Sequence, residues 1–573
     1  MRMRKTMLLL VALAVAIVTA PLAGAAGGPS DRAAEKAQTT EIQILGLNDF
    51  HGALQPPTGS GGRLGPSGTP EFGGVEFLAT HVRQLRATNP NTLFVSAGDL
   101  IGASPLVSAL FHDEPTIEAF NLMGLDYNGV GNHEFDEGVD ELLRMQDGGC
   151  HPVDGCQDGD PFAGASFDFL AANVKYKDSG DTIFPPYAIH KFKGVKVGIV
   201  GMTTLETPTI VTPAGIQTVD FFAEAETVNA LVPHLRAQNV ETIIVLLHEG
   251  GRTSTAGNGT GAGADRINDC ANPTGAIPPI VDAMDDEIDV VVTGHTNWAV
   301  NCVLDGKIVT GAGANGRIVT DIDLTLSRAT KDVVAAKVNN VPVSRDVEKA
   351  ADLTTLVNKY VTLSAPLANR VVGSVTGDIL RLNNAAGESA LGDVIADSQL
   401  AATSDPLFGG AVVAFMNPGG IRTDILHAQI SGGEAAGEVT YGELFQVQPF
   451  SNVMTVLTCS GAQIEALLEQ QFNGGNGVLQ VSEGFAYTYS ASAAPGSKVD
   501  IASITIDGTA ISPLQNYRVA MNNFLATGGD GFSVFTQCTD PLGGEIDLDA
   551  LVAYFEANSP IAPGPQNRIT QLP

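Results

Sequence analysis

Between residue 41 and about residue 327, short apolar runs rich in β-branched residues alternate with segments of helical spacing. The strand-like runs cover residues 42–47, 92–96, 127–130, 169–173, 195–200, 242–247 and 288–293, and the helical patterns cover 75–85, 116–123, 137–145 and 223–235. This alternation restricts the first half of the chain to an α/β fold, in which helices cover the faces of sheets.

The composition changes from Val371 onward, where helical patterns at 390–402 and 462–472 mix with strand-like runs at 411–416, 453–457 and 501–506. We expect a second, mixed α+β domain there. Leu353, Val357 and Tyr360 have helical spacing, so residues 344–370 are predicted to form a linker helix, or alternatively a terminal helix packed on one domain. The expected domains are therefore 41–343 and 371–573.

The first residues are typical of an export signal. Arg2, Arg4 and Lys5 precede an apolar run from Met7 to Val18, and small residues follow. We expect a signal peptide over 1–25 and a disordered lead-in over 26–40. An uncleaved membrane anchor is the alternative, although the run is short for a membrane span. No later stretch is long and apolar enough to span, so an exported protein in the extracellular space or cell envelope is predicted.

The formal net charge of the 573-residue chain is −32. Such an acidic surface repels nucleic acid polymers and anionic lipid, and it argues against a protein that binds a phosphate backbone. An anionic small molecule would still bind if metal ions or a few arginines supplied local positive charge. The oligomeric state is left open by the sequence.

Six cysteines are present, an even number that suggests disulfides in an exported protein. Six cysteines allow fifteen pairings. Proximity in the sequence favours Cys150–Cys156 and Cys270–Cys302, which leaves Cys459–Cys538. No pair has the spacing of a zinc or redox motif, so all six are interpreted as structural.

Polar residues cluster directly after five of the predicted strands. The clusters are Asn48-Asp49-Phe50-His51-Gly52, Gly98-Asp99-Leu100-Ile101-Gly102, Gly131-Asn132-His133-Glu134-Phe135-Asp136, His248-Glu249-Gly250 and Gly294-His295-Thr296-Asn297. Each alone is ordinary turn chemistry, since an Asp after a strand is often a helix cap. Together they bring carboxylate, imidazole and amide groups to strand ends, a ligand set that suits first-row divalent ions such as Zn²⁺ or Mn²⁺.

In order and residue type, these clusters resemble the signature of the calcineurin-like metallophosphoesterases. The resemblance implies a layered αββα domain with two metal ions. It places Asp49, His51, Asp99 and Asn297 on one ion, and Asp99, Asn132, His248 and His295 on the other, with Asp99 as the bridge. Asn297 stands where many members have His or Gln, and its carbonyl oxygen can also act as a ligand.

Three motifs in the second half of the chain indicate which group of metallophosphoesterases the chain resembles. They are Asn417-Pro418-Gly419-Gly420-Ile421-Arg422, Gln448-Pro449-Phe450-Ser451-Asn452, and the Gly-rich run from Phe524 to Phe532. Read jointly, they are similar to the nucleotide-binding C-terminal domain of the 5′-nucleotidases, which include periplasmic UDP-sugar hydrolases and animal ecto-5′-nucleotidase. Taken singly, each motif is an ordinary turn with a core aromatic residue.

That resemblance implies substrate contacts in the second domain. Phe450 and Phe524 would sandwich the base, Asp530 would lie near the ribose, and Asn417 would contact the base beside the close-approaching Gly419. Arg422 would face the phosphate or ribose. The family also often has an Arg before a Glu-x-x-x-Gly turn, where this chain has Ala385, and Arg381 is the nearest substitute.

The implied reaction is release of phosphate from nucleoside 5′-monophosphates and related nucleotides, by direct attack of metal-bound hydroxide. No Gly-x-Ser-x-Gly pattern with triad partners suggests a protein nucleophile. We assign His133 to stabilising the transition state or protonating the leaving group, and Asp136 to orienting its imidazole. Two enzymatic alternatives are a 2′,3′-cyclic nucleotide 2′-phosphodiesterase/3′-nucleotidase and a UDP-sugar or nucleotide pyrophosphatase. An alternative of another class is a secreted nucleotide-binding protein whose metal site is inactive.

Overall fold

The computed structural model describes residues 38–65, 68–211, 213–253, 264–450, 452–472 and 477–572. The predicted signal peptide over 1–25 and most of the predicted lead-in over 26–40 lie outside these residues. Among the helices of the described ranges, none is both long enough and apolar enough to cross a membrane.

Two six-stranded sheets form the centre of the first half of the chain. One has the order β16-β15-β1-β2-β3-β4, and the other has the order β13-β14-β12-β9-β7-β6. The first contains β1 (Thr39–Leu47), β2 (Thr92–Ser96), β3 (Tyr127–Gly129), β4 (Asp168–Leu170), β15 (Ile318–Ser327) and β16 (Val333–Pro342). The second contains β6 (Tyr187–Phe192), β7 (Val195–Thr203), β9 (Thr242–His248), β12 (Val290–Thr293), β13 (Ala299–Leu304) and β14 (Lys307–Ala312).

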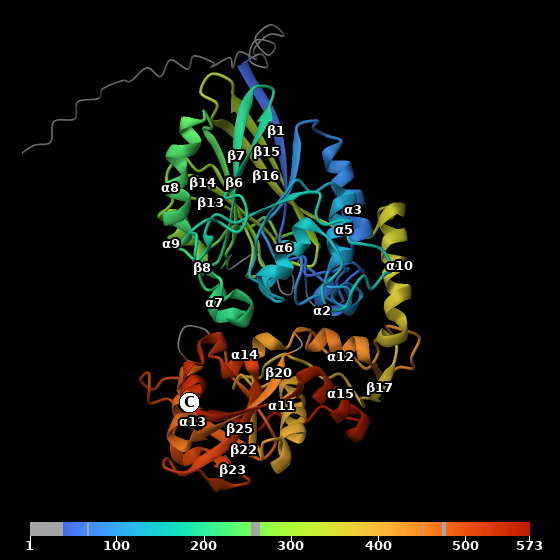
Figure 1. The fold of residues 1–573 in the computed structure, drawn as a ribbon, viewed down its shortest axis with the longest axis vertical. Helices are drawn as coiled ribbons and strands as arrows, with labels where there is room; N and C mark the ends of the chain where they lie inside the picture. The colour runs from blue at the N-terminus through green and yellow to red at the C-terminus, as the bar shows by residue number, and fades with distance from the viewer. Residues whose placement is uncertain are drawn as a thin grey trace, which may run out of the picture. The chain divides into compact units, whose positions relative to one another are not determined.

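The sheets pack face to face because their strands are apolar on both sides, as expected for buried strands. Ile44 and Val95 of one sheet share a buried cluster with Ile199 and Ile244 of the other. The outer faces are covered by α3 (Val75–Arg86) and α5 (Glu114–Met123) on one side, and by α8 (Glu224–Ala237) and α9 (Ile277–Asp282) on the other (Figure 1). This confirms the predicted αββα layers.

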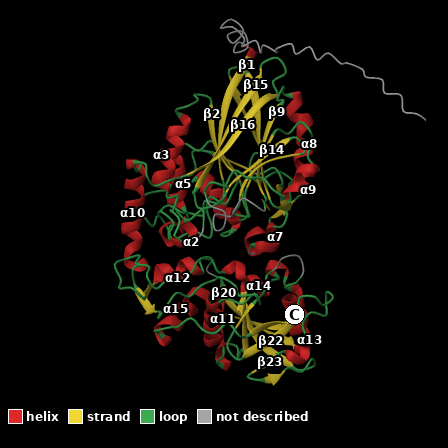
Figure 2. Cartoon of the chain, turned by 180° about the vertical axis from the view of Figure 1, so that it is seen from behind, coloured by secondary structure: helices red, strands yellow, loops and turns green. Residues whose placement is uncertain are grey.

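The second half of the chain is a mixed α+β domain, as predicted (Figure 2). A five-stranded sheet has the order β21-β18-β25-β20-β26, and a four-stranded sheet has the order β24-β23-β22-β27. The strands of the first are β18 (Val413–Met416), β20 (Val453–Ser460), β21 (Gln480–Val481), β25 (Asn516–Asn522) and β26 (Thr539–Ile546). Its helices include α11 (Ala390–Thr403), α12 (Tyr441–Val447), α13 (Gly461–Gln470), α14 (Asn523–Ala526) and α15 (Asp547–Asn558).

Helix α10 (Ala351–Ala368) lies within the predicted linker segment 344–370. It is held to the first domain by Arg83, which forms two hydrogen bonds with Asp352, and by Tyr360, whose hydroxyl donates to Glu118 at 2.9 Å. Tyr360 is fully buried. The helix is therefore packed as a part of the first domain along this face.

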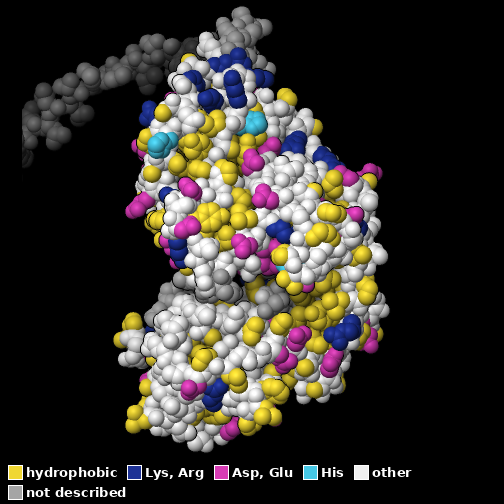
Figure 3. Space-filling model, in the orientation of Figure 1, with side chains coloured by type: hydrophobic (Ala, Val, Ile, Leu, Met, Phe, Trp, Pro, Cys, Tyr) yellow, Lys and Arg dark blue, Asp and Glu magenta, His cyan; other side chains and the backbone are white. Residues whose placement is uncertain are grey.

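The three disulfides are Cys150–Cys156, Cys270–Cys302 and Cys459–Cys538, so the predicted pairing is confirmed. One predicted strand is wrong. Residues 501–506 form a 3₁₀ turn (Ile501–Ser503) followed by the short strand β23 (Thr505–Ile506). On the face shown in Figure 3, acidic side chains are scattered over the surface.

Candidate active site

The five polar clusters meet at one edge of the two sheets. In the first sheet, β1, β2 and β3 are parallel and in register, with Leu47 opposite Ser96 and Ser96 opposite Asn128. In the second sheet, Leu247 of β9 lies opposite Thr293 of β12. The loops after these strands therefore begin at the same level, which is why groups distant in sequence converge.

The backbone at this edge is held in an unusual conformation. Five non-glycine residues of the clusters have positive φ: Asp49 (49°), His51 (49°), Asp99 (51°), His295 (68°) and Asn297 (60°). This backbone conformation is strained for a non-glycine residue, so it persists only where the surrounding structure holds it. Residues with such strain concentrate at functional sites. Here the loops brace one another, because Asp49 N–H donates to the Gly98 carbonyl and His51 N–H donates to the Asp99 carbonyl, both at 3.0 Å.

The Glu134 side chain connects the loop after β2 to the loop after β3 through hydrogen bonds. Its buried carboxylate accepts the backbone N–H groups of Asp99 and Leu100 at 2.9 Å and of Gly131 at 2.7 Å. Three donors on one carboxylate fix the loop after β2 against the loop after β3. This residue belongs to the Gly-Asn-His-Glu motif, but its bracing role is visible only in the structure.

One potential metal-ligand group consists of Asp99, Asn132, His248 and His295. His248 Nε2 lies 3.0 Å from both Asp99 Oδ2 and Asn132 Oδ1, and His295 Nδ1 lies 2.9 Å from Asn132 Oδ1. Ligand atoms about 2.1 Å from one ion are separated by about 3.0–3.4 Å, so this spacing fits a shared cation.

The hydrogen bonds of two histidines prepare them to act as ligands. His248 Nδ1 is 2.7 Å from the Ala97 carbonyl, and His51 Nδ1 is 3.0 Å from the Gly102 carbonyl. Donation from Nδ1–H to a backbone carbonyl leaves Nε2 with a free lone pair, the usual arrangement of a metal-ligating histidine. The residues present therefore fit divalent cations.

The pKa values of the buried histidines are also consistent with metal binding. Burial lowers the pKa values of His51 and His295 to about 3, so both are neutral, as ligands must be. Burial also opposes protonation of His248, but the carboxylates of Asp99 and Asp49 outweigh it and raise its pKa to about 10. A cation would take the place of that proton.

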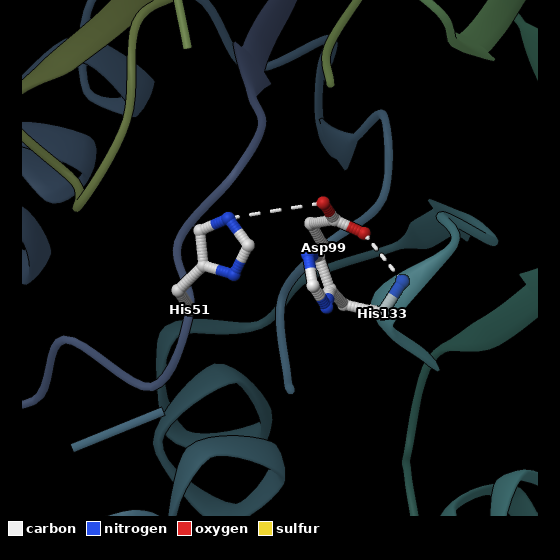
Figure 4. Close-up of side chains that lie close together, drawn as sticks. All are labelled: His51, Asp99 and His133. Atoms are coloured by element: carbon white, nitrogen blue, oxygen red, sulfur yellow. Dashed lines mark hydrogen bonds and ion pairs between the residues drawn. The ribbon is translucent and has the colours of Figure 1, made fainter. Parts of the chain in front are cut away.

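His51, Asp99 and His133 form a second potential ligand group (Figure 4). His51 Nε2 is 3.7 Å from Asp99 Oδ2, and the His133 backbone N–H donates to Asp99 Oδ1 at 3.0 Å. Asp99 lies between the other two residues in Figure 4 and also contacts His248, so it is the residue common to both groups.

Asp49 and Asn297 lie beside this group. Asp49 is fully buried, and its carboxylate accepts the backbone N–H groups of His295 at 2.8 Å and of Asn297 at 3.1 Å. The Asp49 side chain thus connects the loop after β1 to the loop after β12. The two sheets are joined at the site by this carboxylate.

His133 contacts Asp136 as the sequence predicts, with Nδ1 2.9 Å from Oδ2. Burial acts to lower the pKa of His133, but the carboxylates of Asp136 and Asp99 outweigh it, and the pKa is raised above the ordinary value. Gly102 allows this pair to lie close to the loop after β2, because a Cβ at its φ of 79° would come within 2.4 Å of the His133 carbonyl. The pair is therefore tightly packed as well as hydrogen-bonded.

A cavity of about 270 Å³ opens above these residues and is lined by both halves of the chain. From the first domain it is lined by His51, Asp99, Asn132, His133, Asp136, Ile210, Val211, His295 and Asn297. From the second it is lined by Asn417, Gly419, Gly420, Arg422, Phe450, Asn452, Asn522, Phe524 and Asp530. The predicted metal-ligand and nucleotide-binding residues thus share one cavity, with Asp49 and His248 buried behind it.

The second-domain residues hold one another in place. Asn417 Nδ2 donates to Asp530 Oδ2 at 2.8 Å, and Asn522 Nδ2 donates to Asn417 Oδ1 at 3.1 Å. The guanidinium of Arg422 lies over the Phe450 ring, 5.5 Å from its centroid. The Phe524 ring packs over Gly529, where a Cβ would come within 2.5 Å of the ring.

Arg381 lies next to this group, outside the set of described residues that line the cavity. Its Nη1 donates to the Ile421 carbonyl at 3.1 Å. Burial and the Arg381 charge lower the pKa of Arg422. Arg381 is thus placed to act on Arg422, and a direct substrate contact by Arg381 stays a prediction.

Several lining residues were not predicted. Ile210 and Val211 add an apolar wall from the first domain, and Asn452 and Asn522 add amides from the second. Asn452 is in the same motif as Phe450, and Asn522 directly precedes the Phe524 helix, so proximity to a motif is the available sequence signal. Ile210 and Val211 belong to none of the motifs, so no sequence pattern points to them.

A separate cluster of titratable side chains surrounds His112. His112 Nδ1 lies 2.7 Å from Glu137 Oε2, and its Nε2 lies 3.0 Å from Asp154 Oδ2. Burial opposes its protonation, but Glu137 and the other carboxylates raise its pKa to about 9. His151, stacked on it at 3.7 Å, uses its Nδ1 lone pair to accept the Asp154 N–H. The His112 imidazole thus lies between two carboxylates that favour its protonated form.

Comparison with known families agrees with this geometry. Residues 42–298 match the model of the calcineurin-like phosphoesterases, and residues 371–537 match the model of the 5′-nucleotidase C-terminal domain. A cell wall protein of Listeria monocytogenes, Lmo0130, is 33% identical over 580 residues, which cover 96% of this chain and 71% of that protein. The chain belongs to the 5′-nucleotidase family. Its members are metal-dependent nucleotide phosphoesterases, and the side-chain groups at the sheet edge are ones that could hold a metal ion.

Two further comparisons concern a longer relative and a solved structure. Endonuclease YhcR of Bacillus subtilis is 33% identical over 535 residues, and this chain spans 41% of the length of that protein. The crystal structure of a 5′-nucleotidase precursor from Thermus thermophilus has the same fold, with a TM-score of 0.74 at 24% identity, covering 93% of this chain and 99% of that one.

Proposed function

We propose that this protein hydrolyses nucleoside 5′-monophosphates to nucleosides and phosphate. The observation that carries the proposal is the shared cavity, in which Phe450, Phe524 and Asp530 face the same space as the metal-ligand residues. Two aromatic rings suit a nucleobase, because stacking contributes about 1–3 kcal/mol per base and tolerates any base. A phosphate-monoester site beside such rings fits a mononucleotide.

The residues would divide the reaction between the domains. Asp49, His51, Asp99, Asn132, His248, His295 and Asn297 would hold two divalent cations, Zn²⁺ or Mn²⁺. When bound, these cations supply charge neutralisation and an acidified water. Arg422 would bind the phosphate, and Asp530, fixed by Asn417, would accept hydrogen bonds from the ribose hydroxyls.

His133 would act on the leaving group. Its Nδ1 faces Asp136, so the other ring nitrogen is left to donate a proton to transition-state oxygens or to the leaving alkoxide. Asp136 holds the imidazole in that orientation. No covalent intermediate with a protein side chain is required.

The experiment is phosphate release from AMP, 2′,3′-cyclic AMP and UDP-glucose after chelation, with and without added Zn²⁺ or Mn²⁺. We expect AMP hydrolysis that depends on metal and is lost in Asp99→Asn. Asp332→Asn, far from the cavity, is the matched control and should retain it. Hydrolysis of 2′,3′-cyclic AMP or UDP-glucose with AMP unused would overturn the proposal in favour of the phosphodiesterase or pyrophosphatase reaction.

Two other outcomes have separate signatures. Adenosine binding without phosphate release at any metal concentration would indicate a nucleotide-binding protein with an inactive metal site. Cleavage of a nucleic acid polymer would indicate the activity for which the Bacillus relative is named. We consider the latter less favoured, because the net charge of −32 opposes polymer binding.

We also propose that the protein is exported. The three disulfides are stable in an oxidising compartment, and a relative of 33% identity is a cell wall protein. Fractionation of cells into cytoplasm, envelope and medium tests this location. Recovery of the mature chain in the cytoplasm with reduced cysteines would contradict it.

A further inference from the structure

The loop that carries Phe450 is tied to a buried carboxylate outside the cavity. This loop connects α12, which ends at Val447, to β20, which begins at Val453. Asp547, at the start of α15, has a side chain with 1% exposure and accepts the Leu548 N–H through Oδ1 at 2.8 Å. Its other oxygen, Oδ2, is turned toward the Phe450 loop.

Asp547 contacts both ends of that loop. Its Oδ2 lies 3.4 Å from Gln448 Nε2 and 3.3 Å from Asn452 Nδ2, so two side-chain amides donate to one oxygen. The Asp547 backbone N–H also donates to the Asn452 carbonyl at 2.8 Å. Gln448 and Asn452 are themselves buried. Phe450 stands midway between two residues that the same carboxylate holds.

The Phe524 helix is fixed to the same loop. The Val453 N–H, next to Asn452, donates to Asn523 Oδ1 at 2.9 Å, and Asn523 directly precedes Phe524. The two aromatic residues of the proposed base site are thus connected through one short path from Asp547. The separation of the two rings depends on this path.

We propose that Asp547 is a positioning residue that sets the spacing of Phe450 and Phe524 and thereby the preference for substrates that carry a nucleobase. This inference rests on the proposed nucleotidase function. Asp547 does not touch the substrate. It acts through Gln448, Asn452 and Val453, because the two buried amide side chains donate to its Oδ2 and Val453 directly follows Asn452.

The test compares AMP with ribose 5-phosphate, which has the same phosphate ester and no base. We expect Asp547→Ala to raise KM for AMP about tenfold, within the range of a lost base stack, and to change kcat/KM for ribose 5-phosphate much less, by the modest effect of the Phe450 ring on His133 alone. Asp549→Ala, on the exposed face of the same helix, is the matched control. Equal losses on both substrates, or no change on either, would overturn the proposal.

Asp547→Asn separates loop positioning from helix capping. The amide oxygen can still accept the Leu548 N–H, but its NH₂ group faces two donor amides. We expect KM for AMP to rise in this variant too. Wild-type KM in Asp547→Asn would assign Asp547 to the helix end alone and overturn the positioning role.

Calorimetric titration of the full-length chain with adenosine keeps this inference distinct from the proposed reaction. If wild-type protein binds adenosine but releases no phosphate from AMP, the proposed reaction fails, and weaker adenosine binding in Asp547→Ala still supports the positioning role. If adenosine binds wild type and Asp547→Ala equally, the positioning role fails whatever the reaction.

Discussion

The Phe450 ring stacks on the His133 imidazole, with centroids 5.6 Å apart and planes inclined by 17°. The two residues come from different domains and have different predicted roles, one in base binding and one in catalysis. Arg422 lies over the Phe450 ring as well, so this one ring contacts residues proposed to act at the phosphate end and belongs itself to the proposed base site.

Phe450→Ala should raise KM for AMP about tenfold, since stacking on one base contributes about 1–3 kcal/mol. It should also lower kcat modestly, because His133 loses the ring that packs on it. Steady-state kinetics on AMP and ribose 5-phosphate separate the two effects. Phe408→Ala, an exposed aromatic residue of the same domain, is the control, and an unchanged KM in Phe450→Ala would refute the base-stacking role.

His133→Asn should lower kcat for AMP by about 10²–10⁴-fold, the usual size of a general-acid contribution. The loss should be much smaller with p-nitrophenyl phosphate, because its leaving group needs no proton. Metal content, measured by atomic absorption, should stay at the wild-type value. If both substrates lost activity equally, His133 would not act on the leaving group.

Asp136→Asn should lower kcat for AMP by about 10–100-fold, as expected for loss of a carboxylate that orients a functional histidine. The smaller effect follows because the imidazole itself is retained. A loss as large as that of His133→Asn, or none, would show that the 2.9 Å contact does not orient the ring in the reaction.

Glu134→Ala should destabilise the protein by about 2–4 kcal/mol, because three backbone N–H groups lose their buried acceptor. It should also weaken metal binding, since Asp99 and Asn132 lie on the loops that Glu134 braces. Thermal unfolding and metal titration measure the two effects. Glu137→Ala, three residues away and exposed, is the comparison that should retain metal affinity.

The convergence of the predicted metal-ligand residues could be anticipated because their placement follows from topology. Each lies directly after a predicted strand, and the carboxyl ends of parallel, in-register strands meet at one edge. The segment 92–96 was assigned with the bounds that β2 has in the structure, since its first four residues, 92–95, are all apolar or β-branched and leave little ambiguity. Periodicity thus located the strand ends, while the polar clusters and the family resemblance supplied the predicted ligand set.

Other features depended on contacts that periodicity does not encode. The predicted strand at 501–506 is interrupted because Asp500 Oδ1 accepts the Ala502 N–H at 3.0 Å, which favours a turn over strand pairing. The predicted strand at 169–173 ends early, because the Asn173 side chain donates to the Thr203 and Phe222 carbonyls. The His133–Phe450 stack joins residues of separate domains, and no local pattern predicts such a contact.

The stability of the protein should fall as pH rises because of Asp289, at the opposite end of the second sheet from the cavity. Burial and the neighbouring Asp332 raise the pKa of Asp289 to about 7 from 3.8. The folded state therefore retains a proton that the unfolded chain loses, so this contribution to stability is full below about pH 4 and is lost by about pH 7.

Asp289→Asn mimics the protonated acid, because its amide can donate to Asp332 while its oxygen accepts the Ile243 N–H, which lies 2.9 Å from Asp289 Oδ2. The variant should match wild type near pH 4 and be more stable by about 1–3 kcal/mol at pH 8. Urea unfolding at both pH values measures this difference, with Asp286→Asn, whose side chain is 99% exposed, as the control. A variant less stable than wild type at pH 8 would show that Asp289 is needed as a carboxylate.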